Sequence, residues 1–349
     1  MSLENRFPPF REVAKSSLKN RVDQFSNESP LYPIAKAILD SPIDWERTGG
    51  NRQAKQLLAG TVAALHYAYL ETGNEHQYAS YRTEKDPQRM AKLITTVLDD
   101  PTMNPIFYEN LGRPYTSISP SRGIPVQYIC RRRFGDQPIS GVEFGAGGQV
   151  LWTQFNKPRF IDSNFPGKNA LVNVLGKTLN VNITTGLAID KQDVRKDVNW
   201  AKAALWPVED KYNGISIDEV ESLVQESADK QSQFPFLLAD VADPACLEMI
   251  QRTMQSSQLD VCATLYVRHE LNPSAQNNLL AMITKLLRVR GLWIDIGEEL
   301  MHRGQNISNN KVRVFEKTRN NRLELIGEPF ILKNQRDPIL HDLNAFLRI

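Results

Sequence analysis

Five short apolar runs alternate with amphipathic segments in the second half of the chain, and this alternation constrains the fold more than any other feature. The predicted strands are 140–144, 186–190, 235–239, 260–267 and 292–296. Segments with helical apolar spacing separate them, the last at 274–290, where Gly291 fits a helix C-terminus. This order predicts an α/β fold with a parallel sheet. Two further runs, 313–318 and 322–326, predict an antiparallel hairpin at the edge of that sheet.

The first third of the chain has helical apolar spacing instead. One face of the segment 52–72 collects Leu57, Leu58, Val62, Leu65 and Tyr69. Breaks from Pro101 to Pro114 follow the last helical segment. We therefore expect an all-helical N-terminal cap domain over residues 1–135, followed by a Rossmann-like domain over 136–349.

Charge and composition narrow the class of partner. The 349 residues include 42 Lys and Arg against 40 Asp and Glu, a net charge of +2. This balance gives no electrostatic reason to expect nucleic acid or an anionic membrane as partner, so a small-molecule substrate is favoured. The oligomeric state is left open.

The cysteines and the N-terminal segment indicate a compartment. Cys130, Cys246 and Cys262 are widely spaced and form no C-x-x-C pair, so neither a disulfide framework nor a zinc site is indicated. Residues 1–13 lack the apolar region of a signal peptide, and no segment approaches the roughly 20 apolar residues that span a bilayer. We expect a cytoplasmic protein with no metal centre.

Three glycines follow the first predicted strand, in SGVEFGAGGQVL at residues 140–151. Gly145, Gly147 and Gly148 allow positive φ angles and a close approach of a ligand to the backbone. A dinucleotide fingerprint requires a third glycine at the position of Val150, so that interpretation fails. A strand-to-helix turn without a ligand is the alternative.

Glu143, two residues before the first of these glycines, points to a different class of ligand-binding turn. Glu143 with the glycines resembles the first motif of S-adenosylmethionine-dependent methyltransferases, in which an acid ends strand one and the glycines admit the methionine part of the cofactor. The resemblance implies a class I methyltransferase-type sheet whose C-terminal hairpin supplies a reversed strand. It also implies that Asp190, ending the second strand, binds the ribose hydroxyls and that Asp240, after the third, reaches the adenine amino group. Each acid also fits a helix N-cap.

A wider resemblance covers most of the chain. SPLYPIAKAIL, ALHYAYLETGNEHQYASY, VEFGAGGQVLW, GLAIDKQDV and NWAKAALWPVE occur in this order. The series is similar to an uncharacterised bacterial family with a helical N-terminal part and a methyltransferase-like C-terminal part. The chain departs from that pattern in its glycine turn, which lacks a run of small residues, and in TSISPSRGI, which replaces a more polar signature. The resemblance therefore implies a fold and no particular reaction.

The end of the fourth predicted strand, YVRHELNP, offers groups for chemistry. Because free histidine titrates near neutral pH, His269 is a candidate general base, with Tyr266 as a second catalytic candidate and Arg268 as a substrate contact. A surface loop with a solvated Arg–Glu pair is the alternative.

His66 and Tyr69, on the helix predicted at 52–72, are candidate substrate contacts because tyrosines cluster around them and aromatic faces attract a cation such as a sulfonium. Packing in the helical core is the alternative. Together these features predict an S-adenosylmethionine-dependent transferase, a methyltransferase acting on a small molecule. Two alternatives remain: cyclisation of the cofactor's aminobutyryl chain with release of methylthioadenosine, and a non-catalytic binding protein that retains the fold.

Overall fold

The structure is a computed structural model in which the chain forms two compact units. It describes residues 15–16, 18–20, 22–23, 29, 31–48, 54–81, 84–113, 119–147, 151–176, 178–205, 215–254, 258–268, 271–297, 309–333 and 337–349. The first unit combines Met1–Ile118 with Lys196–Ser222, and the second combines Ser119–Arg195 with Leu223–Ile349. The helical unit thus takes in a segment from the middle of the chain, and residues 119–135 belong to the sheet unit.

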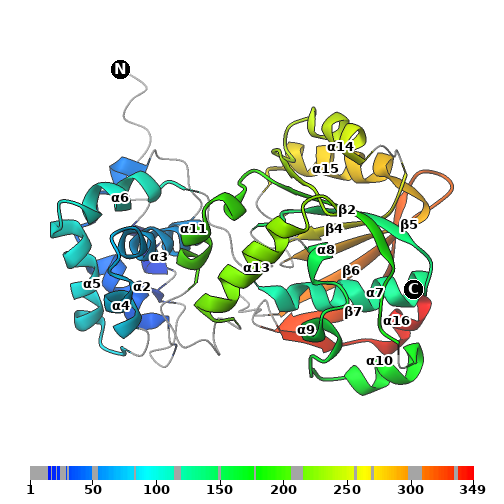
Figure 1. The fold of residues 1–349 in the computed structure, drawn as a ribbon, viewed down its shortest axis with the longest axis horizontal. Helices are drawn as coiled ribbons and strands as arrows, with labels where there is room; N and C mark the ends of the chain where they lie inside the picture. The colour runs from blue at the N-terminus through cyan, green and yellow to red at the C-terminus, as the bar shows by residue number, and fades with distance from the viewer. Residues whose placement is uncertain are drawn as a thin grey trace. The chain divides into compact units, whose positions relative to one another are not determined.

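The first unit is helical, as predicted (Figure 1). Its described elements are α2 (Tyr32–Asp40), η2 (Trp45–Thr48), α3 (Ala54–Glu71), α4 (Glu75–Ser80), α5 (Pro87–Asp99), α6 (Met103–Asn110) and α11 (Val198–Ala203). The apolar face predicted for residues 52–72 is confirmed, since Leu57, Leu65 and Tyr69 are all buried in the core of this unit. Helix α3 packs against the five other α-helices in this series.

Asp197 explains why a distant segment joins this unit. Its Oδ1 caps α11 by accepting a hydrogen bond from the Trp200 N–H at 3.0 Å. Its Oδ2 accepts from the Tyr67 hydroxyl of α3 at 3.0 Å and from the Arg113 guanidinium at 2.6 Å. The Arg113 guanidinium also lies 4.4 Å from the centre of the Trp200 ring. One carboxylate therefore joins α11 to α3 and to the end of the first segment.

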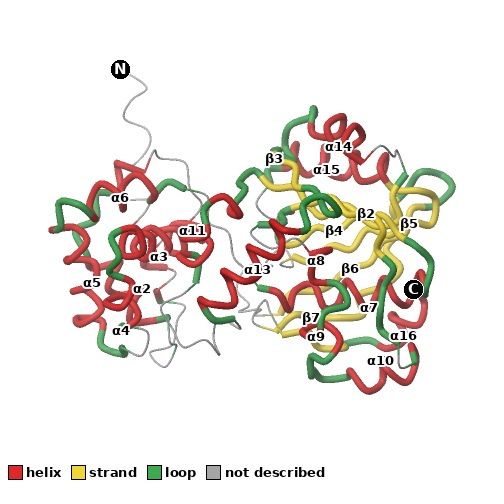
Figure 2. The backbone as a smooth tube through the Cα atoms, in the orientation of Figure 1, coloured by secondary structure: helices red, strands yellow, loops and turns green. Residues whose placement is uncertain are grey.

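The second unit is built on one eight-stranded sheet (Figure 2). Its strands are β1 (Ile139–Phe144), β2 (Ile183–Asp190), β3 (Phe236–Leu238), β4 (Leu259–Leu265), β5 (Leu287–Gly297), β6 (Asn309–Lys317), β7 (Leu323–Lys333) and β8 (Asp337–Leu340). The order is β3-β2-β1-β4-β5-β6-β7-β8. Strands β1 to β5 pair in parallel, and β6, β7 and β8 add antiparallel pairs. The mixed α/β fold with a C-terminal hairpin is confirmed, and β8 extends the hairpin.

Helices cover both faces of this sheet. They are α7 (Ile124–Phe134), α8 (Leu151–Gln154), α9 (Pro158–Ile161), α10 (Lys168–Leu175), α14 (Cys246–Met254), α15 (Pro273–Leu286) and α16 (Leu343–Arg348), with the 3-10 helices η3 (Pro120–Gly123) and η4 (Val194–Lys196). Helix α13 (Ile217–Asp229) begins in the first unit and ends in the second. Val261 and Ala263 pack into a core with Trp152 of α8, whereas Cys262 packs into another with Ile250 of α14. Because side chains alternate along a strand, these two cores lie on opposite faces of the sheet.

The helix predicted over 274–290 ends four residues early, so this boundary is wrong. Helix α15 ends at Leu286, and Gly291 lies inside β5. A Cβ atom at Gly291 would lie 2.9–3.1 Å from the carbonyl oxygens of Arg288, Leu259 and Asp260. This glycine therefore allows backbone segments to approach closely, and it does not end a helix.

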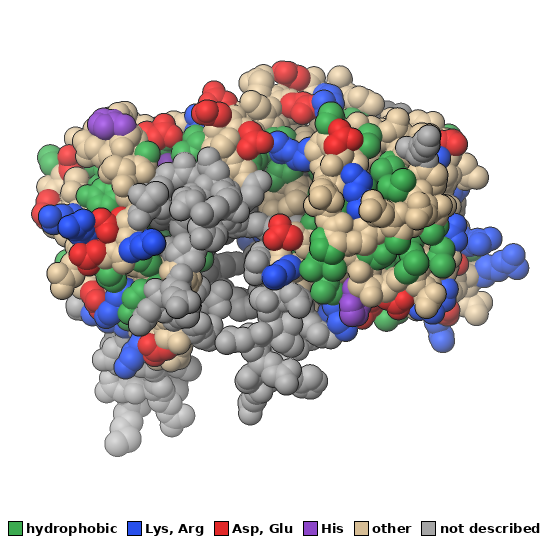
Figure 3. Space-filling view, turned by 90° about the horizontal axis from the view of Figure 1, so that it is seen from below, with side chains coloured by type: hydrophobic (Ala, Val, Ile, Leu, Met, Phe, Trp, Pro, Cys, Tyr) green, Lys and Arg blue, Asp and Glu red, His purple; other side chains and the backbone are tan. Residues whose placement is uncertain are grey.

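On the face shown in Figure 3, acidic and basic side chains of the described residues are interspersed. Across the described ranges, no helix is long and apolar enough to cross a bilayer. Those ranges also hold no cluster of three or more His, Cys, Asp or Glu side chains arranged to bind a metal ion.

Candidate functional site

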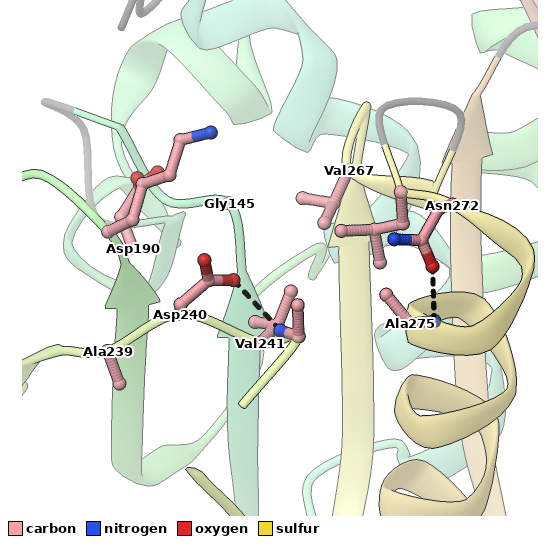
Figure 4. A pocket seen from close by; sticks show the side chains of 11 residues that line it. Gly145, Asp190, Ala239, Asp240, Val241, Val267, Asn272 and Ala275 are labelled. Atoms are coloured by element: carbon pink, nitrogen blue, oxygen red, sulfur yellow. Dashed lines mark hydrogen bonds between the residues drawn. The ribbon is translucent and has the colours of Figure 1, made fainter. Parts of the chain in front are cut away.

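A cavity of about 250 Å³ lies where the carboxyl ends of the parallel strands β1 to β4 meet (Figure 4). This volume is slightly below the roughly 300–1,000 Å³ typical of small-molecule sites. The lining residues come from the glycine turn, from the end of β2, from the segments after β3 and β4, and from the start of α15: Gly145, Asp190, Lys191, Ala239, Asp240, Val241, Ala242, Val267, Leu271, Asn272 and Ala275. Parallel α/β sheets bind ligands at this edge.

The glycine turn has the predicted backbone geometry. Gly145 has φ +77° and Gly147 has φ +59°, whereas Gly148 lies outside the described residues. The N–H groups of Gly145 and Ala146 donate to the carbonyl of Ile189 at 2.9 and 3.2 Å. The N–H of Gly147 donates to Asp190 Oδ2 at 2.9 Å. Each of these three N–H groups is therefore bonded within the protein, so they do not form the cradle of free N–H groups that binds a phosphate.

Gly145 lies close against the segment at the end of β4. A Cβ atom at this position would lie 2.0 Å from Val267 Cγ2 and 3.3 Å from the carbonyl oxygen of Leu265. The turn after β1 thus touches the end of β4, and a larger residue would push these two walls apart.

Asp190 lies at the cavity wall and is held by the backbone. Besides the bond from Gly147, its Oδ1 accepts from the Gln192 N–H at 3.2 Å. Burial raises the pKa of Asp190 above its ordinary value, and the two N–H groups oppose that rise. The next described helix, η4, begins only at Val194, so Asp190 is not its N-cap. A carboxylate held in this way retains a lone pair on each oxygen for a ligand hydroxyl.

Glu143 lies inside the protein and is absent from the residues that line the cavity. Its Oε2 accepts a hydrogen bond at 2.7 Å from the N–H of Leu151, the first residue of α8. Burial, together with the nearby charge of Asp190, raises the pKa of Glu143 to about 8. Glu143 therefore binds the chain just beyond the glycine turn, and Asp190 binds the turn itself.

Asp240 lines the cavity and is exposed. Its Oδ1 accepts from the Ala242 N–H at 2.8 Å, which forms a local turn after β3. Helix α14 begins at Cys246, so the N-cap alternative does not apply to Asp240 for that helix. Its second oxygen makes no hydrogen bond to a described residue.

Of the described residues directly after β4, Val267 lines the cavity, whereas Tyr266 and Arg268 contact other side chains. Tyr266 has φ +61°, and the Arg122 guanidinium lies 4.3 Å from the centre of its ring. Arg268 forms an ion pair at 3.4 Å with Asp295, a buried carboxylate that also pairs with Arg313. Neither Tyr266 nor Arg268 lines the cavity, although Val267 between them does. His269 lies outside the described residues.

His66 and Tyr69 belong to the core of the helical unit. Each is 1% exposed. The His66 ring stacks on Tyr78 with a centroid distance of 4.0 Å, and the Tyr69 hydroxyl donates to the carbonyl of Leu93 at 3.0 Å. Burial raises the pKa of Tyr69 to about 12. This environment favours the packing alternative over direct contact with a substrate.

The start of α15 contributes lining residues that the sequence interpretation missed. Leu271, Asn272 and Ala275 line the cavity, and Asn272 caps α15 by accepting from the Ala275 N–H at 2.9 Å. The sequence signal was Asn272 followed by Pro273, a common N-cap and first-turn pair.

Comparisons with known proteins find a distant likeness. No family model and no curated protein matches the chain. Among solved structures, the Burkholderia thailandensis 1,6-didemethyltoxoflavin-N1-methyltransferase, with bound 1,6-didemethyltoxoflavin and S-adenosylhomocysteine, is 13% identical over 72% of each chain, with a TM-score of 0.28. The CurJ carbon methyltransferase is 10% identical over 84% of this chain and 72% of its own, with a TM-score of 0.32.

MtNAS in complex with MTA and tNA is 11% identical over 94% of this chain and 93% of its own, with a TM-score of 0.29. These identities and scores assign no activity to this chain. The wider resemblance to a bacterial family stays a prediction.

Proposed function

We propose that the protein is an S-adenosylmethionine-dependent methyltransferase that acts on a small molecule. The observation that carries this proposal is the pairing of Asp190 with Gly147. It places a carboxylate on the cavity wall, and it occupies an N–H group of the turn that a phosphate ligand would need. The cofactor has ribose hydroxyls for such a carboxylate and no phosphate.

The charge of the cavity favours the same ligand. Three charged side chains are found among its described lining residues, namely Asp190, Asp240 and Lys191. Two negative charges and one positive charge leave a net charge of −1, which disfavours a nucleotide phosphate and favours a sulfonium cation.

The described residues fit separate parts of the cofactor. Asp190 would accept hydrogen bonds from the ribose hydroxyls, and Asp240 would accept from the adenine amino group through its second oxygen. The turn at Gly145 and Gly147 would leave room for the methionine part. When bound, the cofactor supplies a methyl carbon activated by the adjacent sulfonium.

The groups that act on the acceptor are proposed from their position in the chain. Tyr266 directly precedes Val267, which lines the cavity, and His269 follows Val267 by two residues in the sequence. We keep His269 as the base that removes the acceptor's proton, with Tyr266 as the second catalytic group and Arg268 as a contact to the acceptor.

Label transfer tests this function. The protein is incubated with S-adenosylmethionine labelled in its methyl group and with a small-molecule cell extract, and the Asp190→Ala variant is the matched control. We expect label in a small molecule and an equal amount of S-adenosylhomocysteine, both strongly reduced in the variant. Release of methylthioadenosine without an acceptor, or no adenosylhomocysteine above the variant's level, would contradict methyl transfer.

A further inference from the structure

Asn272 uses only part of its hydrogen-bonding capacity in the fold. Its Oδ1 accepts from the Ala275 N–H at 2.9 Å, so the oxygen is committed to the cap of α15. This bond also fixes which atom of the amide is the nitrogen, because only the oxygen can accept from an N–H. Nδ2 makes no hydrogen bond to a described residue and is turned toward the cavity (Figure 4). A donor thus faces the cavity from the α15 side.

Asp240 offers the complementary group from the side of β3. One of its carboxylate oxygens accepts from the Ala242 N–H at 2.8 Å, and the other has no partner among the described residues. Between the donor and the acceptor, the walls are apolar and include Val241, Val267 and Leu271. A ligand that fits here has apolar faces, one edge that donates and another atom that accepts.

We infer that Asn272 is a specificity-determining residue of this cavity, whose Nδ2 donates a hydrogen bond to a ring nitrogen of the adenine base. Adenine has apolar faces, an amino group that donates and ring nitrogens that accept. The amino group meets Asp240, and one ring nitrogen meets Asn272. This assignment rests on the proposed function and adds a base-recognition residue to it.

The test separates recognition from capping by using two substitutions that preserve the cap. Serine and aspartate are both good N-cap residues, so Asn272→Ser and Asn272→Asp keep α15 capped while removing the amide donor. Binding of S-adenosylhomocysteine is measured by titration calorimetry, and thermal unfolding checks the fold. A neutral hydrogen bond contributes about 0.5–1.5 kcal/mol, so we expect about a two- to tenfold weaker affinity for Asn272→Ser. The affinity of Asn272→Asp for S-adenosylhomocysteine should fall further, because its carboxylate oxygen would face a ring nitrogen that is also a hydrogen-bond acceptor.

A matched control exists in the same unit. Asp342 caps α16 by accepting from the Ala345 N–H at 2.9 Å, the same bond as in Asn272, and it is absent from the cavity lining. Asp342→Ser should bind S-adenosylhomocysteine with the affinity of the original protein.

The 1-deaza, 3-deaza and 7-deaza analogues of S-adenosylhomocysteine identify the partner atom, because each lacks one ring nitrogen. One analogue should bind the original protein as weakly as the parent ligand binds Asn272→Ser, and it should lose no further affinity in that variant. Equal binding of the parent ligand to the original protein and to both Asn272 variants would overturn the inference alone. The inference would also be overturned if the Asn272→Ser substitution weakened the binding of all three analogues as much as it weakens the binding of the parent ligand. No binding to the original protein would overturn the proposed function, and the inference with it.

Discussion

The Asp190 carboxylate accepts a hydrogen bond from the backbone N–H of Gly147 at 2.9 Å, across 43 residues of sequence. This bond joins the end of β2 to the turn after β1. The same carboxylate lines the cavity, so a ligand that binds Asp190 also stabilises the shape of the turn. We therefore expect cofactor binding and turn geometry to change together in variants of this site.

Gly145→Ala should abolish ligand binding at the cavity. The new Cβ would lie 2.0 Å from Val267 Cγ2, and the residue would keep an unfavourable φ of +77°. Gly135→Ala is the matched control, because Gly135 also has a positive φ, +59°, but a Cβ there meets nothing within 4 Å. Calorimetric titration with S-adenosylhomocysteine should show loss of binding in the first variant only. Equal binding by both variants would show that the contact with Val267 is unimportant.

Glu143→Gln should reduce the fall of stability with rising pH. The pKa of Glu143 is about 8 in the folded protein against an ordinary value of 4.5, so the folded protein holds an extra proton between these pH values. Stability therefore falls as pH rises through this window. Glutamine keeps an oxygen for the Leu151 N–H and carries no charge. Urea unfolding at pH 5 and pH 8 measures the effect, with the exposed Glu324→Gln as control. An unchanged difference between the two pH values in Glu143→Gln would refute the assignment.

Asp197→Ala should destabilise the helical unit. The change removes the cap of α11 and leaves Arg113 and Tyr67 without this acceptor, and together these losses are worth about 2 kcal/mol or more. Asp86→Ala removes the cap of α5 and an exposed ion pair with Arg89, and it should cost about 1 kcal/mol because an exposed ion pair contributes little. Chemical denaturation followed by circular dichroism compares them. Equal losses would mean that the contacts to Tyr67 and Arg113 contribute nothing measurable.

The sequence predicted those parts of the fold that local patterns determine. The parallel strands and the C-terminal hairpin follow from apolar runs of strand length, and the positive φ values of Gly145 and Gly147 follow from glycine chemistry. The predicted end of α15 was wrong because a glycine after an apolar helix can either end that helix or allow another backbone segment to approach closely. Only the packing of Gly291 against the Leu259 and Asp260 carbonyls distinguishes them.

Sequence patterns indicated some of the residues that line the candidate cavity and missed others. Asp190 ends β2 and Asp240 follows β3, and both line the cavity because the ends of these strands meet at one edge of the sheet. Asn272 was missed because the sequence indicates only its helix cap, whereas its place in the cavity lining depends on where tertiary packing puts the start of α15. The joining of residues 196–222 to the helical unit depends on contacts of Asp197 that span up to 130 residues, which no local pattern indicates.

Titration of the protein with S-adenosylhomocysteine, beside its Asp190→Asn and Asp243→Asn variants, tests the central claim most directly. Asp243 is exposed and absent from the cavity lining, and asparagine can replace it in the bond to the Ala245 N–H. We predict saturable binding to the original protein and to Asp243→Asn, and binding at least about tenfold weaker to Asp190→Asn, since hydrogen bonds to a charged group contribute about 1.5–3 kcal/mol. No binding to the original protein, or equal binding to all three, would contradict the assignment of this cavity as the cofactor site.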